Sequence, residues 1–194
     1  MFKKILKWVT GLVVGIAFIF IIIIHVLGNF HKISEEVYRS GQLNKYNLEY
    51  YVKKYKIKTI INLRGTSKKE WYKTEKAIAD EFDINHISFG ITNKEFYDFN
   101  QTSQIVSMLK NVEKPLLIHC EGGADRTSLV SALYQYAVVK KSAEESAKEF
   151  SVFYGYAPFY RSYVIAMKNS FENYVANSKK QKEKEQNEKK HIDD

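Results

Sequence analysis

A nine-residue stretch around the only cysteine of the chain has the residue types that phosphoryl chemistry needs. It is His119-Cys120-Glu121-Gly122-Gly123-Ala124-Asp125-Arg126-Thr127. An apolar run, residues 115–118, precedes it, and residues 128–134 have a helix-like pattern, which predicts the order strand, glycine-containing loop, helix. Backbone N–H groups at a helix N-terminus point at one place, and the helix dipole adds positive charge there. The stretch therefore predicts a cradle for a phosphate-sized anion.

Cys120 and Arg126 supply the two reactive features of this loop. The positive field that holds an anion also favours a thiolate over a thiol, so the Cys120 sulfur is expected to be nucleophilic at neutral pH. The planar guanidinium of Arg126 suits two phosphate oxygens at once. Together they predict attack of sulfur on a phosphomonoester, giving a phospho-cysteine intermediate that water then hydrolyses.

These residues resemble the signature of cysteine-dependent phosphatases, His-Cys, five residues, then Arg-Ser or Arg-Thr. Over residues 37–156 the chain is similar to the compact dual-specificity branch of the protein tyrosine phosphatase superfamily. Residues 37–42 resemble the first strand and turn of that family, and residues 60–64 resemble its strand that ends in Asn-Leu-Arg. The Gly-Ala-Asp-Arg-Thr form of the loop is similar to a bacterial subgroup. The resemblance implies a phosphoric monoester hydrolase.

Further residues are expected to support the reaction. Thr127 is placed to hydrogen-bond the sulfur, and His119 is expected to hold the loop. Arg64 ends a strand next to the loop strand, where it would contact substrate or brace the loop. The expected phosphate-binding residues, chiefly through backbone N–H groups, are Glu121, Gly122, Gly123, Ala124, Asp125 and Arg126.

The proton donor for the leaving oxygen stays open between three carboxylates. The family places an Asp upstream of the nucleophile, in a loop after a strand, but residues 88–93 contain no carboxylate. Asp125 is one candidate because related loops carry an Asp at this position. Asp98 and Glu95 follow the window closely. Each carboxylate also has a non-catalytic interpretation. Asp125 could form an ion pair that orients Arg126, and Asp98 and Glu95 could lie at a solvated helix start.

Two other functional classes use similar loops. A catalytically inactive phosphate-binding module would fit the missing upstream Asp. A thiol enzyme of the arsenate-reductase or sulfurtransferase type also has Cys and Arg at this spacing, but the Asn-Leu-Arg segment and the Asp-Arg-Thr ending argue against it. We therefore expect a phosphatase that acts on phosphotyrosine or phosphoserine proteins, on phospholipids or on small phosphate esters.

Composition restricts the cofactors and partners. One cysteine excludes an internal disulfide, and the scattered histidines form no zinc-like cluster, so neither a metal nor a cofactor is predicted. The net charge of +8 favours anionic partners. We expect a phosphorylated protein or lipid as the partner, and no nucleic acid.

The N-terminus has the composition of a membrane anchor. Residues 8–27 contain no Asp, Glu, Lys or Arg and are long enough to cross a bilayer as a helix. Lys3, Lys4 and Lys7 precede them, which places the N-terminus in the cytoplasm and the catalytic domain on the periplasmic or extracellular side. A cleaved signal peptide is the alternative, although no Ala-x-Ala-like site follows.

The rest of the chain alternates strands with helices, which predicts an α/β domain with a mainly parallel central sheet flanked by helices, the site lying at a strand's carboxyl end. The expected division is residues 1–30 as the anchor, 31–177 as the catalytic domain and 178–194 as a charged, disordered tail. Predicted strands cover residues 57–63, 84–89 and 116–119, and predicted helices cover residues 44–55, 67–82, 99–111, 126–140, 142–153 and 158–176.

Overall fold

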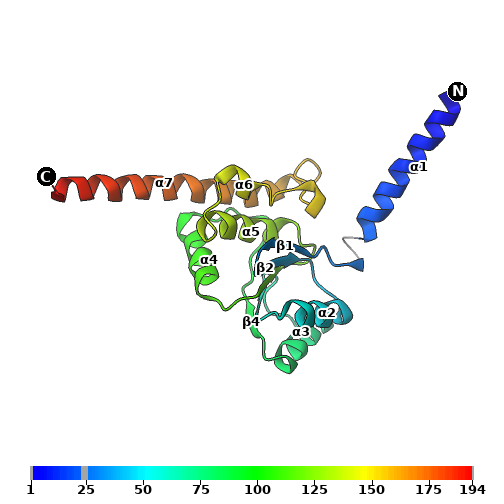
Figure 1. Cartoon of the computed structure of the whole chain (residues 1–194), viewed down its shortest axis with the longest axis horizontal. Helices are drawn as coiled ribbons and strands as arrows, with labels where there is room; N and C mark the ends of the chain where they lie inside the picture. Colours follow the sequence, from blue (N-terminus) through cyan, green and yellow to red (C-terminus); the bar gives the residue numbers. More distant parts are fainter. Residues whose placement is uncertain (1, 23–25, 194) are drawn as a thin grey trace.

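The computed structural model describes residues 2–22 and 26–193 and has one sheet at its centre, with helices on both faces (Figure 1). Its strands are β1 (His31–Ser34), β2 (Val37–Ser40), β3 (Thr59–Asn62), β4 (Asn85–Ser88) and β5 (Leu116–His119). Its helices are α1 (Phe2–Ile21), α2 (Lys45–Tyr55), α3 (Glu70–Glu81), α4 (Phe99–Asn111), α5 (Asp125–Ala137), α6 (Ala143–Ala147) and α7 (Ile165–Asp193), with the 3-10 helices η2 (Val152–Tyr154) and η3 (Ser162–Val164).

The sheet is mainly parallel, with the strand order β1-β2-β5-β3-β4. Only β1 is antiparallel to its neighbour, and it lies at the edge. In register, His119 of β5 lies beside Ser40 of β2 and Asn62 of β3. The carboxyl ends of these parallel strands therefore meet at one edge of the sheet. The loop that follows β5 begins at the middle of this edge, because β5 is the central strand.

Alternating side chains of the strands supply two cores, one on each face. Leu116 and Ile118 pack with residues of α4, α5 and α7, whereas Leu117 between them packs with residues of α2 and α3. Because both faces are buried, β5 is apolar through its first three residues rather than alternating. This central burial fixes the position of Cys120, which follows directly.

The last helix differs from the sequence prediction at both ends. It begins at Ile165 instead of residue 158, since turns and η3 occupy residues 157–164. It then continues through Asp193, beyond the end expected near residue 176, and its far end projects from the domain (Figure 1). Residues 178–193 are rich in Lys, Glu and Gln, which favour helix locally even without a core to pack against. The side chains of residues 179–188 are exposed.

The N-terminal helix corrects the membrane predictions. Among the described residues, 2–22 and 26–193, no helix is both long and apolar enough to span a bilayer. α1 begins at Phe2 and so includes Lys3, Lys4 and Lys7, which were expected to precede the span. The predicted transmembrane helix over residues 8–27 and the single-pass localisation derived from it are therefore wrong; residues 23–25 of that stretch lie outside the described residues.

Candidate active site

The loop between β5 and α5 lines a small cleft at the carboxyl edge of the sheet. β5 ends at His119, and α5 begins at Asp125. The cleft has a volume of ≈ 230 Å³. Its lining residues are Asn93, Cys120, Glu121, Gly122, Ala124, Asp125, Arg126 and Arg161. The nucleophile candidate, the loop and the start of α5 thus share one cavity.

Gly123 brings the loop against the end of β2. Its φ of +67° lies in the left-handed region, and a Cβ there would meet the Gly41 nitrogen at 2.5 Å and the Ser40 carbonyl carbon at 2.6 Å. The Gln42 N–H also donates to the Glu121 carbonyl oxygen at 2.8 Å. Only glycine allows this close approach of two backbones, so the loop conformation depends on Gly123.

Arg39 of β2 is buried in the core and hydrogen-bonds to the loop. Its guanidinium is fully buried and donates to the Gly123 carbonyl oxygen at 2.7 Å and to Ser128 Oγ at 3.0 Å. The Glu149 carboxylate pairs with it at 2.5 Å, and the Tyr154 ring lies 4.1 Å from its central carbon. A buried charge is tolerated only when it is paired and hydrogen-bonded in this way. Arg39 therefore braces the loop and does not line the cleft.

Asn29 is a second brace that the sequence did not predict. Residues 1–30 were expected to form the anchor, yet Asn29 is fully buried, and its Nδ2 donates to the carbonyl oxygens of Gly122 and Tyr154 at 2.9 Å each. The adjacent Gly28 carbonyl oxygen accepts from the Gly41 N–H at 2.8 Å. Residues 28 and 29 therefore pack with the domain, although the expected boundary lay after residue 30.

Arg126 and Arg64 both lie close to the loop. Arg126 donates from Nη1 to the carbonyl oxygens of Leu63 and Ile91, each at 3.2 Å, which fixes its guanidinium at the cleft. Arg64 stacks on the Trp71 ring at 3.6 Å and pairs with Glu121 at 3.3 Å. Burial lowers the pKa of Arg64, and Glu121 partly offsets that effect. Arg64 thus neutralises the one carboxylate that directly follows Cys120.

Asp125 faces the cleft in an ion pair with Arg161, not with Arg126. Its two carboxylate oxygens accept from Arg161 Nη1 and Nη2 at 3.0 and 3.1 Å, and Asn93 Nδ2 donates to it at 2.8 Å. The side chain of Asp125 is only 7% exposed. All three bonds are donated to the carboxylate, so in this arrangement Asp125 is an acceptor.

The other two acid candidates lie outside the cleft. Asp98 caps α4: its carboxylate accepts from the Gln101 N–H at 2.8 Å, and the Gln101 side chain accepts in return from the Asp98 N–H at 2.9 Å. This is the capping box that Asp followed by Gln forms at a helix start. Glu95 is exposed. Neither residue lines the cavity around Cys120.

A buried carboxylate, that of Glu75 in α3, accepts a hydrogen bond from His119 at the end of β5. It accepts hydrogen bonds from His119, His86, Gln42 and Asn62 at distances between 2.7 and 3.2 Å. Burial by itself would raise the pKa of Glu75, but His119 and these hydrogen bonds together hold the pKa well below its ordinary value. The sequence does not reveal this role of Glu75, because no neighbouring residue along the chain marks it as buried.

Thr127, near the start of α5, has a buried hydroxyl group that does not contact the Cys120 sulfur as expected. Its Oγ1 makes no hydrogen bond within the described part of the chain, although the residue is fully buried. The bond to the Cys120 sulfur that the sequence predicts is therefore not formed in this structure. Buried hydroxyl groups without a partner are rare. This one lies in the first turn of α5, close to the loop.

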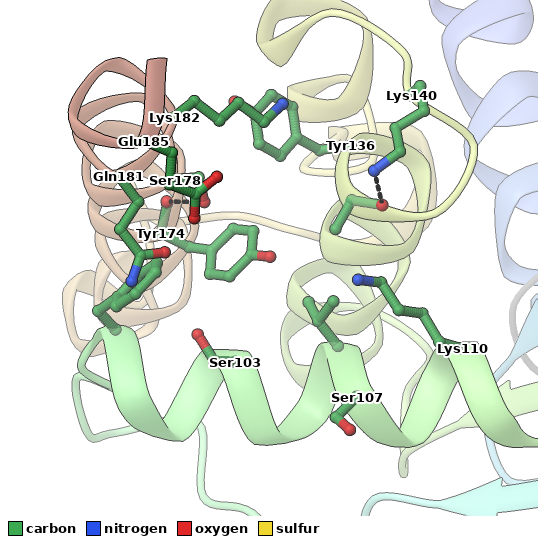
Figure 2. A pocket seen from close by; sticks show the side chains of 13 residues that line it. Ser103, Ser107, Lys110, Tyr136, Lys140, Tyr174, Ser178, Gln181, Lys182 and Glu185 are labelled. Carbon is green, nitrogen blue, oxygen red and sulfur yellow. Dashed lines mark hydrogen bonds between the residues drawn. The ribbon is translucent and has the colours of Figure 1, made fainter. Parts of the chain in front are cut away.

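A larger cavity of ≈ 350 Å³ lies elsewhere, between α4, α5 and α7. Figure 2 shows Lys110, Lys140 and Lys182 at its margin together with several hydroxyl groups. Lys140 donates to the Ala137 carbonyl oxygen at 2.7 Å near the end of α5, as basic residues at helix C-termini commonly do. None of the loop residues lines this cavity, so it is separate from the reactive site.

Comparison with known families supports the chemistry that the loop suggests. A family described as "DSP-PTPase phosphatase fused to NAD+ Kinase" matches residues 29–193. The chain belongs to this family. It is a cysteine-dependent phosphatase of the compact dual-specificity type, which confirms the resemblance read from the sequence. No curated protein matches the sequence.

Solved structures share the fold of this phosphatase at low sequence identity. The core catalytic domain of the PP-IP phosphatase SIW14 from S. cerevisiae has a TM-score of 0.63 and 19% identity, over 82% of this chain and 93% of that chain. TpbA from P. aeruginosa has a TM-score of 0.58 and 18% identity, over 77% of this chain and 90% of that chain. TpbA has also been solved in complex with pTyr.

Proposed function

We propose that this phosphatase hydrolyses phosphate monoesters through a phospho-cysteine intermediate on Cys120. The observation that carries the proposal is the shared cleft, in which Cys120 follows a central strand and Arg126 lies at the start of a helix. In the first step the Cys120 sulfur attacks phosphorus and the ester oxygen departs. In the second step water attacks the phospho-cysteine and releases inorganic phosphate and the free sulfur.

Transition-state charge would fall on oxygens that face the loop. Backbone N–H groups of residues 121–126 and the Arg126 guanidinium are the donors for these oxygens. Arg126 is already held by two carbonyl oxygens, so little reorganisation is needed when substrate binds. His119, anchored by Glu75, positions the end of β5, and the unpartnered hydroxyl of Thr127 is available to the departing sulfur in the second step.

We assign the leaving-group proton to Asp125 among the three candidates. It is the one of them that lines the cleft, while Asp98 is engaged as a helix cap. Because its carboxylate accepts three hydrogen bonds in this structure, proton donation requires that one of these contacts be exchanged. An aryl phosphate, whose leaving group needs little protonation, should depend less on Asp125 than an alkyl phosphate does.

Two relatives suggest different substrates. A Cys-to-Ser variant of TpbA was solved in complex with pTyr, and SIW14 is described as a PP-IP phosphatase. A phosphotyrosine or phosphoserine protein, a phospholipid head group and a small phosphate ester all offer the phosphoryl group that the loop would bind. The size of the cleft, ≈ 230 Å³, favours a compact phosphorylated group.

The decisive experiment is hydrolysis of p-nitrophenyl phosphate by the purified full chain, without added metal or reductant. We expect turnover in the wild type and a loss of at least about a thousandfold in Cys120→Ser, with orthovanadate binding retained by the variant. Turnover that survives in Cys120→Ser would refute the cysteine mechanism. Vanadate binding without any turnover in the wild type would instead indicate a phosphate-binding module.

A further inference from the structure

Arg161 shares the cleft with Cys120 and Arg126 although it comes from a distant part of the chain. It lies at the start of η3, directly after two exposed aromatic residues, Phe159 and Tyr160. Its side chain is 30% exposed, whereas that of its partner Asp125 is 7% exposed. Both residues line the cleft, and the guanidinium is the more accessible of the two groups.

The contacts of Arg161 fix the guanidinium but do not use all of its donors. Nη1 makes one bond, to Asp125, and Nη2 makes two, to Asp125 and to the Gly155 carbonyl oxygen at 3.0 Å. A guanidinium has five N–H donors. Among the described residues, the Nε–H and one Nη1–H of Arg161 have no protein acceptor, so these two donors are available to a ligand.

Two positioned guanidinium groups, Arg126 and Arg161, thus border one small cavity. The charge of Asp125 is compensated by Arg161, and the charge of Glu121 is compensated by Arg64 at 3.3 Å. An anion in the cleft therefore meets donors without an unpaired carboxylate opposing it. If the reacting phosphoryl group occupies the loop beside Arg126, Arg161 remains for a second anionic group close by.

We propose that Arg161 is a specificity-determining residue that binds a second anionic group of the same substrate. The preferred substrates are then compact phosphate compounds in which another phosphate neighbours the reacting one, rather than isolated monoesters. This inference rests on the proposed function, because it takes Cys120 as the position of the reacting phosphorus. Arg suits the role because a guanidinium keeps N–H donors for a ligand while its bonds to Asp125 and Gly155 hold it in place.

The test compares kcat/KM for inositol monophosphate and for a vicinal inositol bisphosphate, using the full chain. The variants are Arg161→Gln, Arg161→Lys and, as a control for loss of a surface charge, Lys168→Gln on α7. We expect the wild type to prefer the bisphosphate. Arg161→Gln should reduce that preference by about tenfold to a hundredfold, the size of a lost hydrogen bond to a charged group. Arg161→Lys should fall between, and Lys168→Gln should keep the wild-type preference.

The readout is the ratio between the two substrates, because Arg161 also contacts Asp125 and both rates can fall together. An equal loss for both substrates, or a wild type without preference, would overturn the inference. Binding gives a second measure: Cys120→Ser should bind inorganic pyrophosphate more tightly than inorganic phosphate, and adding Arg161→Gln should abolish the difference. If Cys120→Ser still hydrolyses these substrates, the proposed function fails; if it does not and the ratio is unchanged, only the role of Arg161 fails.

Discussion

At the scale of single residues, the residues that we propose for catalysis and for positioning are held by hydrogen bonds to the surrounding structure. Arg126 is fixed by the carbonyl oxygens of Leu63 and Ile91, and His119 is fixed by Glu75. Such supporting contacts set the orientation of a reacting group before substrate arrives, which reduces the cost of reorganisation.

Asp125→Asn should lower kcat for an alkyl phosphate by about a hundredfold or more and affect p-nitrophenyl phosphate much less. The reason is that a poor leaving group needs a proton as its bond breaks. Steady-state kinetics on both substrates measure the difference. Asp98→Asn is the matched control, since that carboxylate caps α4 outside the cleft. Equal losses on the two substrates in Asp125→Asn would mean that the residue only positions Arg161.

Glu75→Gln should reduce the free energy of unfolding at neutral pH by about 3 kcal/mol, because it removes the charge on which four hydrogen bonds converge. The pKa of Glu75 is lowered in the folded state from an ordinary value of 4.5. Its stabilisation is therefore complete above that value and is lost as the pH falls below it. Urea denaturation at neutral and acidic pH should show the gap between wild type and variant shrinking in acid.

The control for this measurement is Glu81→Gln, at the exposed end of the same helix. We expect it to change the free energy of unfolding by less than about 0.5 kcal/mol. A gap between wild type and Glu75→Gln that widens in acid would contradict the assigned charge state.

At the scale of elements, the site is built where three parallel strands end together. β2, β5 and β3 bring Ser40, His119 and Asn62 to one edge of the sheet, and α5 begins there with its N-terminus toward the cleft. The loop after β5 then packs on the turn after β2. This contact between two backbones leaves no room for a side chain at Gly123, whereas Gly122 has space for one.

Gly123→Ala should destabilise the protein by about 3 kcal/mol or more and abolish most of the activity, because the added Cβ meets backbone atoms at a positive φ. Gly122→Ala is the matched control: a Cβ there has no neighbour within 4 Å, and its stability should stay within about 0.5 kcal/mol of the wild type. Thermal unfolding of both variants measures the contrast. Similar stabilities for the two would show that the loop does not hold this close packing.

At the scale of the whole molecule, the segments outside the sheet differ in how they join the domain. The first part of α7 contributes Met167 and Phe171 to the core, where both are fully buried. The exposed part of the helix follows. At the other end of the chain, Asn29 reaches the phosphate loop although it precedes the first strand. The domain therefore includes more of the N-terminal segment than composition indicates.

Asn29→Ala should lower the free energy of unfolding by about 1 to 3 kcal/mol, because two buried carbonyl oxygens lose their donor. It should also lower kcat, since one of these carbonyls belongs to Gly122 in the loop. Chemical denaturation and p-nitrophenyl phosphate kinetics give the two readouts. Asn100→Ala, an exposed position in the first turn of α4, is the control and should leave both unchanged. Wild-type behaviour of Asn29→Ala would mean that the loop keeps its shape without this brace.

The sequence by itself determined the chemistry and the order of the elements. Cys120, Arg126 and the glycines lie within nine consecutive residues, so their relation follows from local backbone geometry at a strand-to-helix turn. Periodicity and capping signals likewise predicted α2, α4 and the start of α6, because such signals act within one or two helical turns; α6 ends at Ala147 instead of residue 153. The parallel sheet followed from the alternation of strands with helices.

Only the tertiary structure decided which distant groups complete the site. Asn29 lies 93 residues from Gly122 in the chain, Glu75 lies 44 residues from His119, and Arg161 lies 36 residues from Asp125. No local pattern relates such pairs, since their contacts exist only once the sheet and both layers of helices have packed. The prediction of a membrane span from the charge-free N-terminal stretch was wrong: composition did not show that the helix begins at Phe2 and includes three lysines, and no described helix is long and apolar enough to span a bilayer.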